Sequence, residues 1–287
     1  MIRYVIVTPV RDEQEFLPFT YESVVRQTLR PLEWVIVNDG SKDWTGELID
    51  CYSRKHNWIH AVHRSDRGSR RWGGGIIEAF YEGFYALTHR DWEFMAKLDG
   101  DLSFEPDYFA SLFERCAQNP NLGICGGMLY HFENGRMTVE RHPLFHVRGG
   151  VKTYRRACWD ALEGLWIGPG SDTLDEVKAQ MLGWNTRSFP DLQLQHHRAT
   201  GSSWGRWGGM VKNGKTDYVC GYHPLFMAAK AVTRLIERPY VLGSLALVCG
   251  YLAAYLHKLP QVDDPGLIRY LRAQQMARLA GRQTIWR

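Results

Sequence analysis

The chain has 287 residues, of which 45% are hydrophobic, and a formal net charge of +4 at pH 7. This composition can bury a core, which excludes a disordered chain, and the length suits one large domain with an appendage. The positive excess is too small and too evenly spread to indicate a nucleic-acid partner. The six cysteines are scattered without a Cys-x-x-Cys pair, which favours a reducing, cytoplasmic compartment.

The first apolar run predicts a strand and not an export signal. Residues 4–7 are short, continuous and β-branched, as in a strand buried on both faces of a parallel sheet. The apolar stretch contains Pro9 and continues directly into Arg11-Asp12-Glu13, unlike a signal peptide. We therefore expect a domain that is not exported.

Strands and helices alternate over the first hundred residues. This alternation predicts an α/β fold with an open, mostly parallel sheet and helices on both faces. Ligands of such sheets bind beyond the carboxyl ends of the strands. The expected elements are a helix over 16–29, a strand over 34–37, a helix over 45–55, a strand over 60–63, a helix over 76–87 and a strand over 94–98.

The second half of the chain has a looser pattern. A helix is predicted from about residue 172 to before Gly183, then an apparent strand within the segment 192–198, and beyond Tyr222 the chain is helical and apolar. We expect a catalytic domain over 1–220, with a nucleotide-binding half (1–115) and an acceptor half (116–220). Residues 221–287 would form a helical region for membrane association or oligomerisation.

Polar and acidic groups follow the predicted strands. Thr8, Glu13 and Asp39 follow the first two strands, and Asp99 and Asp101 follow the strand over 94–98. Asp99 and Asp101 are two residues apart, so in an extended chain both carboxylates point to one side, where they repel unless a cation lies between them or one is protonated. Carboxylates suit Mg²⁺ or Mn²⁺, which keep positions for substrate phosphates. The alternative is an ordinary Asp-Gly-Asp turn.

Three segments together resemble family 2 glycosyltransferases. They are Val7-Thr8-Pro9-Val10-Arg11-Asp12-Glu13, Val37-Asn38-Asp39-Gly40-Ser41 and Lys97-Leu98-Asp99-Gly100-Asp101. The resemblance implies a GT-A fold, a nucleotide-diphospho-sugar donor such as a UDP- or GDP-sugar, and inversion at the anomeric carbon.

The resemblance also implies roles for single residues. Thr8, Pro9 and Glu13 would line the nucleotide pocket, and Asp39 would bind the base or ribose. Asp99 and Asp101 would serve the ribose and the Mn²⁺- or Mg²⁺-bound diphosphate. For Asp39, a turn or helix-capping aspartate is the competing interpretation.

The family's general base usually lies in a Glu-Asp pair at a helix start, with a basic residue six positions later and a glycine eleven later. Asp172, Lys178 and Gly183 match that spacing, which makes Asp172 the predicted base. Ser171 replaces the usual glutamate, so Asp175 and Glu176 remain alternates. A carboxylate that only complements the helix dipole is the structural alternative.

Two histidines that follow an apparent strand in the segment 192–198 supply a candidate metal ligand. His196 and His197 are adjacent, so they point to opposite faces and at most one reaches the metal; His196 is our choice. A packed or surface histidine is the alternative for either.

Two loops complete the predicted site. Arg67, Arg70 and Arg71 with Gly73-Gly74-Gly75 precede a helix and could receive phosphate, unless they form a solvated basic loop. Trp204-Gly205-Arg206-Trp207 could cover the bound sugar. This loop lacks the Gln-x-x-Arg-Trp pattern of processive synthases, which favours single addition.

The C-terminal region suggests a membrane surface. Residues 240–256 have no charge and are flanked by Arg238 and Lys258, but the run is shorter than the roughly 20 residues of a spanning helix. An arginine-bearing tail with a partial apolar stripe follows, suited to an anionic leaflet. We expect an enzyme at the cytoplasmic face of the cell membrane that acts on a lipid-linked glycan. A soluble cap on the sheet or on a twin subunit, as in a homo-oligomer, is the alternative.

Two other functions are compatible with part of this pattern. A nucleotidyltransferase would carry a glycine-rich first loop, and residues 8–13 contain no glycine. A non-catalytic scaffold of a polysaccharide assembly would keep the fold without the base, and Ser171 keeps that interpretation open.

Overall fold

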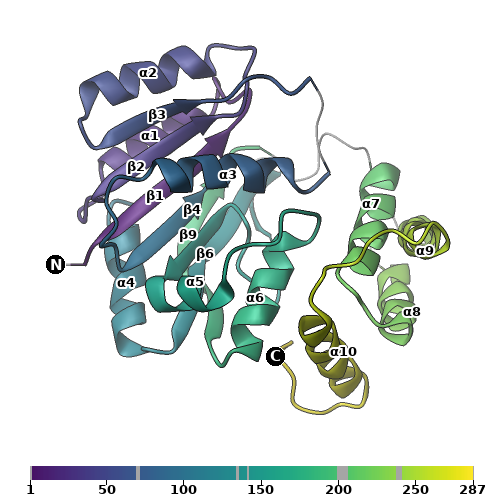
Figure 1. Cartoon of the computed structure of the whole chain (residues 1–287). Helices are drawn as coiled ribbons and strands as arrows, with labels where there is room; N and C mark the ends of the chain where they lie inside the picture. The colour runs from purple at the N-terminus through teal and green to yellow at the C-terminus, as the bar shows by residue number, and fades with distance from the viewer. Residues whose placement is uncertain are drawn as a thin grey trace.

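The computed structural model describes residues 2–68, 72–133, 136–140, 142–198, 206–236 and 241–286. It consists of an α/β part that contains the sheet and a group of C-terminal helices beside it (Figure 1). The described strands form one sheet in the order β3-β2-β1-β4-β8-β6-β9-β5, with β7 paired to β6. The strands are β1 (Tyr4–Val10), β2 (Glu33–Asn38), β3 (Ile59–His63), β4 (Phe94–Leu98), β5 (Leu102–Phe104), β6 (Leu122–Glu133), β7 (Arg136–Val139), β8 (Val151–Arg155) and β9 (Asn185–His196).

The half of the sheet built from β3, β2, β1 and β4 is parallel throughout, as predicted. The strands β1, β2 and β4 are buried along their whole length because helices cover both faces. The other half is mixed, since β8 runs antiparallel to both β4 and β6 while β9 runs parallel to β6.

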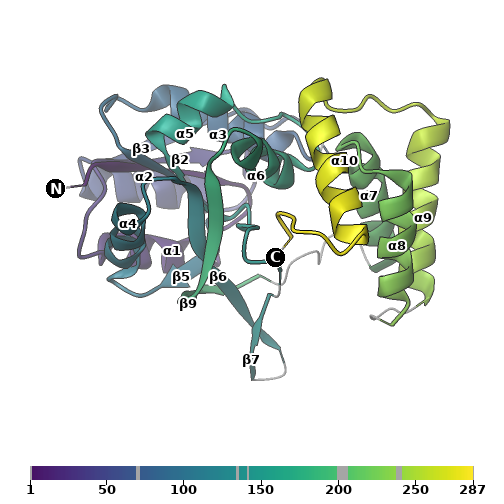
Figure 2. The same ribbon diagram turned by 90° about the horizontal axis from the view of Figure 1, so that it is seen from below.

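Helices cover the sheet in two layers. Tyr4 and Ile6 of β1 pack in the core under α1 (Leu17–Val25), α2 (Thr45–Lys55) and α4 (Tyr108–Gln118). Val5 and Val7 pack in the opposite core under α3 (Gly75–Ala86), α5 (Arg156–Leu162) and α6 (Ser171–Met181). Figure 2 shows α1 and α4 on one side of the sheet and α3 and α5 on the other. The alternation of strand side chains therefore produces both cores.

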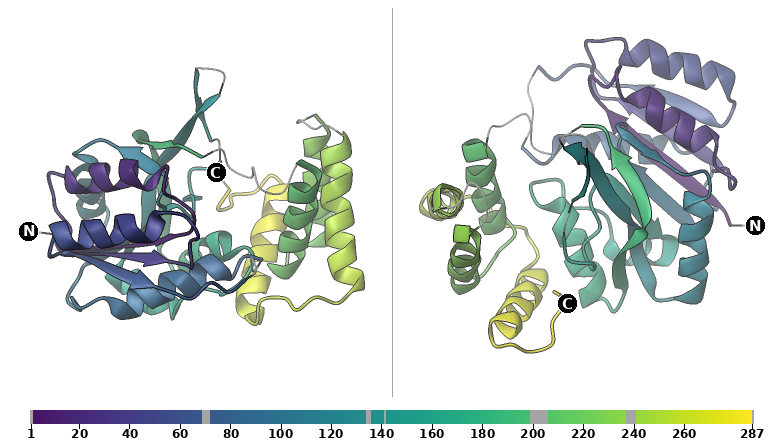
Figure 3. Two further views of the ribbon diagram at one scale, coloured as in Figure 1. Left: turned by 90° about the horizontal axis from the view of Figure 1, so that it is seen from above. Right: turned by 180° about the vertical axis from the view of Figure 1, so that it is seen from behind.

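The C-terminal helices form their own cluster and pack on α6 (Figure 3). They are α7 (Arg206–Val219), α8 (Pro224–Thr233), the 3-10 turn η1 (Arg234–Ile236), α9 (Val241–Leu256) and α10 (Pro265–Leu279). A Cβ at Gly214 would collide with the Leu247 carbonyl, and one at Gly250 with the Val211 carbonyl, so α7 and α9 touch backbone to backbone. α7 thus groups with the helices beyond residue 220.

Candidate active site at the carboxyl ends of the strands

A cavity of about 410 Å³ opens where β1, β2 and β4 end. It lies at the position where parallel α/β sheets bind ligands. Its walls come from the three segments that carry the sequence motifs, from Arg67 and the residues 73–79 that lead into α3, and from Arg198 and Lys212. The lining residues are Pro9, Val10, Arg11, Glu13, Asp39, Arg67, Gly73, Gly75, Ile76, Ala79, Asp99, Gly100, Asp101, Arg198 and Lys212.

Asp39 lies at the β2 end of the cavity and is held by two arginines. Its carboxylate pairs with Arg64 at 2.7 Å and with Arg67, which also reaches Glu78 at 2.8 Å. Gly40 follows with a φ of +72°, and a Cβ there would meet the backbone of Asp66. The turn therefore requires glycine and fixes the carboxylate at the cavity wall, where it can accept hydrogen bonds from base or ribose.

Asp99 and Asp101 lie on the cavity floor with unsatisfied oxygens. In the described part of the chain, the buried Oδ1 atom of each has no hydrogen-bond partner. Burial raises the pKa of Asp99, and the charges of Asp101 and Asp172 raise it further against the opposing Lys97, whose Nζ lies 3.6 Å away. A cation bound between these carboxylates would relieve this cost.

These residues fit a divalent cation that is shared with a substrate. Mg²⁺ and Mn²⁺ prefer carboxylate oxygens, and Mg²⁺ is typically held by one or two carboxylates together with substrate phosphates. Among the described residues, no group of three or more His, Cys, Asp or Glu side chains is arranged to hold a metal ion. Phosphate and water oxygens would therefore have to complete the coordination of an ion at Asp101.

His196 contacts Asp101, as a metal-site histidine would. Its Nε2 lies 3.3 Å from Asp101 Oδ2, and its Nδ1 lies 2.8 Å from Glu140 Oε1. Burial alone would lower the pKa of His196, but its hydrogen bonds to Asp101 and Glu140 raise it to about 10. As an imidazolium it holds the two carboxylates together, and it would have to lose a proton to bind a metal. Glu140 carries no sequence signal that could have identified it.

His197 points to the other side of the strand, as expected of adjacent residues. Its ring stacks on Phe19 with centroids 4.2 Å apart, and its Nε2 lies 2.9 Å from Ser103 Oγ. Its backbone nitrogen donates to the Asp101 carbonyl at 2.9 Å. His197 therefore stabilises the loop that contains Asp99 and Asp101, and it does not line the cavity.

Asp172 lines an adjoining cavity of about 230 Å³ that shares Asp99 and Lys212 with the first. It lies in the first turn of α6. A Cβ at Gly149 would collide with the Asp172 carboxylate, and one at Gly150 with the Asp99 carboxylate. The two glycines thus allow both carboxylates to approach the same short segment of backbone.

Asp172 is suited to accept a proton. Burial by itself would raise its pKa, but Lys97 and Lys152, with smaller effects from His146 and Arg148, outweigh burial and hold the pKa below its ordinary value. The carboxylate is therefore ionised at neutral pH. An ionised carboxylate beside a cavity that opens onto Asp99 is the arrangement that a general base requires.

The structure does not bring the alternates Asp175 and Glu176 to either cavity. Both are buried, and both pair with Lys152, at 2.7 Å and 2.9 Å. Asp175 also accepts from the Tyr154 hydroxyl at 2.6 Å, and Glu176 lies 2.7 Å from His146 Nδ1. Lys152 donates in addition to the Asp172 carbonyl at 2.5 Å. This buried network anchors α6 and leaves Asp172 as the candidate base.

Thr8 is also absent from the cavity wall. It is fully buried, and its hydroxyl accepts a hydrogen bond from Trp34 Nε1 at 2.9 Å. The neighbouring Pro9 does line the cavity, so β1 contributes Pro9 and Val10 to the cavity wall instead of Thr8. Arg70, Arg71 and the loop over 201–205 lie outside the described residues.

The cavity contains cations that the sequence analysis did not select. Arg198 lies two residues after the end of β9 and pairs with Glu13 at 2.8 Å. Lys212 projects from α7 into both cavities. Burial and the charge of Asp101 raise the pKa of Glu13 to about 8, against the opposing effect of Arg198. Only the fold could identify Lys212, because α7 carries no motif.

Comparison with known proteins identifies the family. A model described as glycosyl transferase family 2 matches residues 5–164, more than half of the chain. The chain is similar to the uncharacterized glycosyltransferase EpsJ of Bacillus subtilis, with 29% identity over 133 residues that cover 46% of this chain and 36% of the relative. It is also similar to the undecaprenyl-phosphate mannosyltransferase of Micrococcus luteus, with 26% identity over 113 residues that cover 39% and 44% of the two chains.

A solved structure shows the same fold. The mannosyltransferase PcManGT of Pyrobaculum calidifontis, in complex with GDP-Man and Mn²⁺, aligns with a TM-score of 0.56 and 17% identity. The alignment covers 98% of this chain and 76% of that one. In the two sequence relatives, by contrast, the match spans less than half of their length. With its motifs at the carboxyl ends of β1, β2 and β4, the chain belongs to glycosyl transferase family 2 and has the GT-A fold.

Proposed function

We propose that the protein is an inverting, divalent-metal-dependent glycosyltransferase that uses a nucleotide-diphospho-sugar. The observation that carries the proposal is the junction of two cavities at Asp99. One cavity offers carboxylates and cations to a nucleoside diphosphate. The other presents an ionised carboxylate, Asp172, to an incoming hydroxyl group.

The first cavity suits the donor. Asp39 at one end would accept hydrogen bonds from the base or ribose of a UDP- or GDP-sugar. Asp101, with Asp99 and His196, would hold Mn²⁺ or Mg²⁺, which would supply charge stabilisation for the diphosphate. Lys212 lies on the same wall and would add a cation near the phosphates. A structural neighbour carries GDP-Man and Mn²⁺, which supports this class of donor.

The second cavity suits the acceptor. In the proposed step, an acceptor hydroxyl oxygen forms a bond to the anomeric carbon while the bond from that carbon to the diphosphate oxygen breaks. Asp172 takes the hydroxyl proton, and the nucleoside diphosphate leaves with the bonding electron pair. Because attack comes from the side opposite the leaving group, the configuration at the anomeric carbon inverts.

Release of nucleoside diphosphate from a panel of UDP- and GDP-sugars tests the activity. We expect release by purified protein with Mn²⁺ or Mg²⁺ and none with EDTA, because the leaving diphosphate needs charge stabilisation. Water can serve as a slow acceptor, so the assay does not require the natural one. A folded protein that binds nucleotide but releases no diphosphate with any sugar or added glycan would instead favour the scaffold function.

The surface of the C-terminal helices suggests where the acceptor is located. α9 has 16 residues, and within the described ranges no helix is long and apolar enough to cross a membrane. One side of α9 is nevertheless apolar and half or more exposed. Its residues recur at spacings of three, seven and four, which place them on one face of a helix. They are Leu242 (61%), Leu245 (50%), Leu252 (50%) and Leu256 (76%). On α8, which packs against α9, Leu225 (60%) and Val232 (65%) are exposed as well.

We propose that this apolar face lies on the cytoplasmic surface of the cell membrane and that the acceptor is a lipid-linked glycan. An exposed apolar helix face next to Lys258 is suited to the interface between lipid headgroups and acyl chains. Similarity to an undecaprenyl-phosphate mannosyltransferase supports a lipid-linked acceptor.

Binding to vesicles of phosphatidylglycerol and phosphatidylcholine tests this placement. Wild-type protein is expected to sediment with the vesicles, and the Leu245→Glu/Leu252→Glu variant to stay in solution, because two charges would enter the apolar layer. Leu182→Glu, at a similarly exposed leucine after α6, is the matched control. The face is a subunit interface instead if light scattering shows that the wild-type protein is a dimer and the double variant a monomer, and if neither protein binds vesicles.

A further inference from the structure

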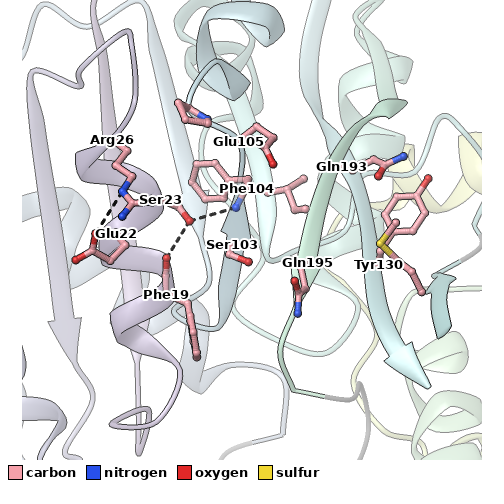
Figure 4. A pocket seen from close by; sticks show the side chains of 13 residues that line it. Phe19, Glu22, Ser23, Arg26, Ser103, Phe104, Glu105, Tyr130, Gln193 and Gln195 are labelled. Atoms are coloured by element: carbon pink, nitrogen blue, oxygen red, sulfur yellow. Dashed lines mark hydrogen bonds and ion pairs between the residues drawn. The ribbon is translucent and has the colours of Figure 1, made fainter. Parts of the chain in front are cut away.

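A groove of about 550 Å³ lies outside the donor and acceptor cavities and shares no lining residue with them. It runs between α1 on one side and the strands β5, β9 and β6 on the other, as Figure 4 shows. The groove is lined by Phe19, Glu22, Ser23, Arg26, Ser103, Phe104, Glu105, Pro106, Tyr130, Met137, Gln193, Leu194 and Gln195. Its volume falls within the range of roughly 300–1,000 Å³ that is typical of small-ligand sites.

The strand side of the groove presents a row of polar side chains. Ser103 pairs with Gln195 in the sheet, and Gln195 pairs with Tyr130, so the three residues stand side by side across β5, β9 and β6. Gln193 lies two residues before Gln195 and therefore on the same face of β9. Gln193 is exposed, and within the described residues its amide makes no hydrogen bond. This face offers amide donors and acceptors beside an aromatic ring.

Aromatic rings line the groove between its polar groups. Phe19 of α1 is 47% exposed, and Phe104 of β5 also lines the groove. Such a surface matches a sugar chain, whose rings have apolar faces and whose edges carry hydroxyl groups. An apolar ligand would leave the amides without partners, which is costly. A phosphate-rich ligand would need cations, and the lining's single cation, Arg26, already lies 3.5 Å from Glu22.

A line of stacked side chains connects the groove to the donor cavity. Arg198, which lines the donor cavity, lies over the Phe16 ring at 5.3 Å. Phe16 stacks with His197 at 6.3 Å, and His197 stacks with Phe19 of the groove at 4.2 Å. These contacts place one end of the groove next to the donor cavity, where a glycan that extends from the active site would enter it.

We infer that this groove binds a stretch of uncharged oligosaccharide, and that it holds part of the acceptor or product glycan at a distance from the reacting hydroxyl. The role in catalysis rests on the proposed function, whereas the binding of sugar does not. Tyr130, Gln193, Gln195 and the carboxylate of Glu105 supply hydrogen-bonding groups for the sugar hydroxyls, and Phe19 and Phe104 supply the apolar rings of the site. The groove makes the enzyme favour longer acceptors.

The inference is tested by titrating the full chain with four neutral pentasaccharides, built from glucose, mannose, N-acetylglucosamine or galactose. Binding of at least one is expected at about millimolar affinity, which is usual for a shallow site with few hydrogen bonds. Gln193→Ala/Glu105→Ala should weaken it about tenfold, because hydrogen bonds to the sugar hydroxyls are lost. Gln118→Ala/Glu114→Ala, at exposed positions of α4, is the matched control.

Two outcomes overturn the inference. Either no pentasaccharide binds the folded protein, or binding is unchanged in Gln193→Ala/Glu105→Ala. Nucleotide titrations of the same samples separate this failure from a failure of the proposed function, because nucleotide binding does not involve the groove. If transfer is active, the double variant should raise KM for a long acceptor about tenfold with kcat unchanged. A merely structural role would not distinguish long from short acceptors.

Discussion

Replacing Asp172 with Asn is expected to lower kcat by about 10²- to 10⁴-fold, the usual contribution of a general base. The amide keeps the size of the side chain but cannot accept the proton of the acceptor hydroxyl. Affinity for the donor nucleotide should stay the same, because Asp172 lines the adjoining cavity and not the nucleotide cavity. Rates of sugar transfer, and calorimetric titration with the nucleotide, measure the two effects separately.

Glu47→Gln is the matched control for this variant. Glu47 is an exposed carboxylate in the first turn of α2, so its loss changes a helix terminus in the same way without touching either cavity. Full activity of Asp172→Asn would disprove the assignment of the base. Protonation of Asp172 should not limit the rate until the pH falls below the usual titration range of an aspartate, since the pKa of Asp172 is depressed.

Asp101→Asn is expected to remove the metal dependence of nucleotide binding. Loss of even an outer-shell partner commonly costs about 10- to 100-fold in metal affinity, so loss of a direct carboxylate ligand should weaken binding of nucleotide with Mn²⁺ by at least about 100-fold. The unpartnered Oδ1 of Asp101 is the observation behind this expectation. Calorimetric titration of the variant with UDP and GDP, each with Mn²⁺ and with EDTA, measures the change.

Asp107→Asn serves as the control for Asp101→Asn. Asp107 is exposed, lies six residues further along the chain at the start of α4, and lines none of the cavities described above. Its variant should bind as the wild type does. If Asp101→Asn also retains metal-dependent binding, the metal is held elsewhere, and the role that the resemblance implied for Asp101 fails.

The parallel half of the sheet could be predicted from sequence because its strands are buried on both faces. Continuous apolar runs ending in polar clusters identified β1, β2 and β4, and the helix over 45–55 matches α2. The mixed half could not be predicted in the same way. β8 includes a buried lysine, Lys152, and β6 contains Gly126 and Gly127, which pack against neighbouring backbone. Such strands lack the hydrophobic pattern on which prediction depends.

Candidate site residues were predictable where a motif follows a strand, and not where the fold brings in a distant side chain. Pro9, Glu13, Asp39, Asp99 and Asp101 all line one cavity, as the shared edge of the sheet required. Glu140 and Lys212 come from segments without a motif, and their place in the site depends on the folding of the second half of the chain.

The alternates for the base, Asp175 and Glu176, show the same limit of prediction from sequence. One helical turn separates Asp172 from Asp175 and Glu176, so spacing alone could not choose among them. The choice depends on Lys152, a residue of β8 that pairs with the latter two and leaves Asp172 at the cavity. Burial of a charged partner on another strand is not visible in a local pattern.

Calorimetric titration of the wild-type protein with UDP and with GDP, each in Mn²⁺ and in EDTA, tests the central claim most directly. The account predicts that one nucleotide binds when the metal is present and binds much more weakly without it, since Asp39 and the Asp99 to Asp101 segment together form the donor site. A folded protein that binds neither nucleotide under either condition would contradict the assignment of this cavity as a donor site.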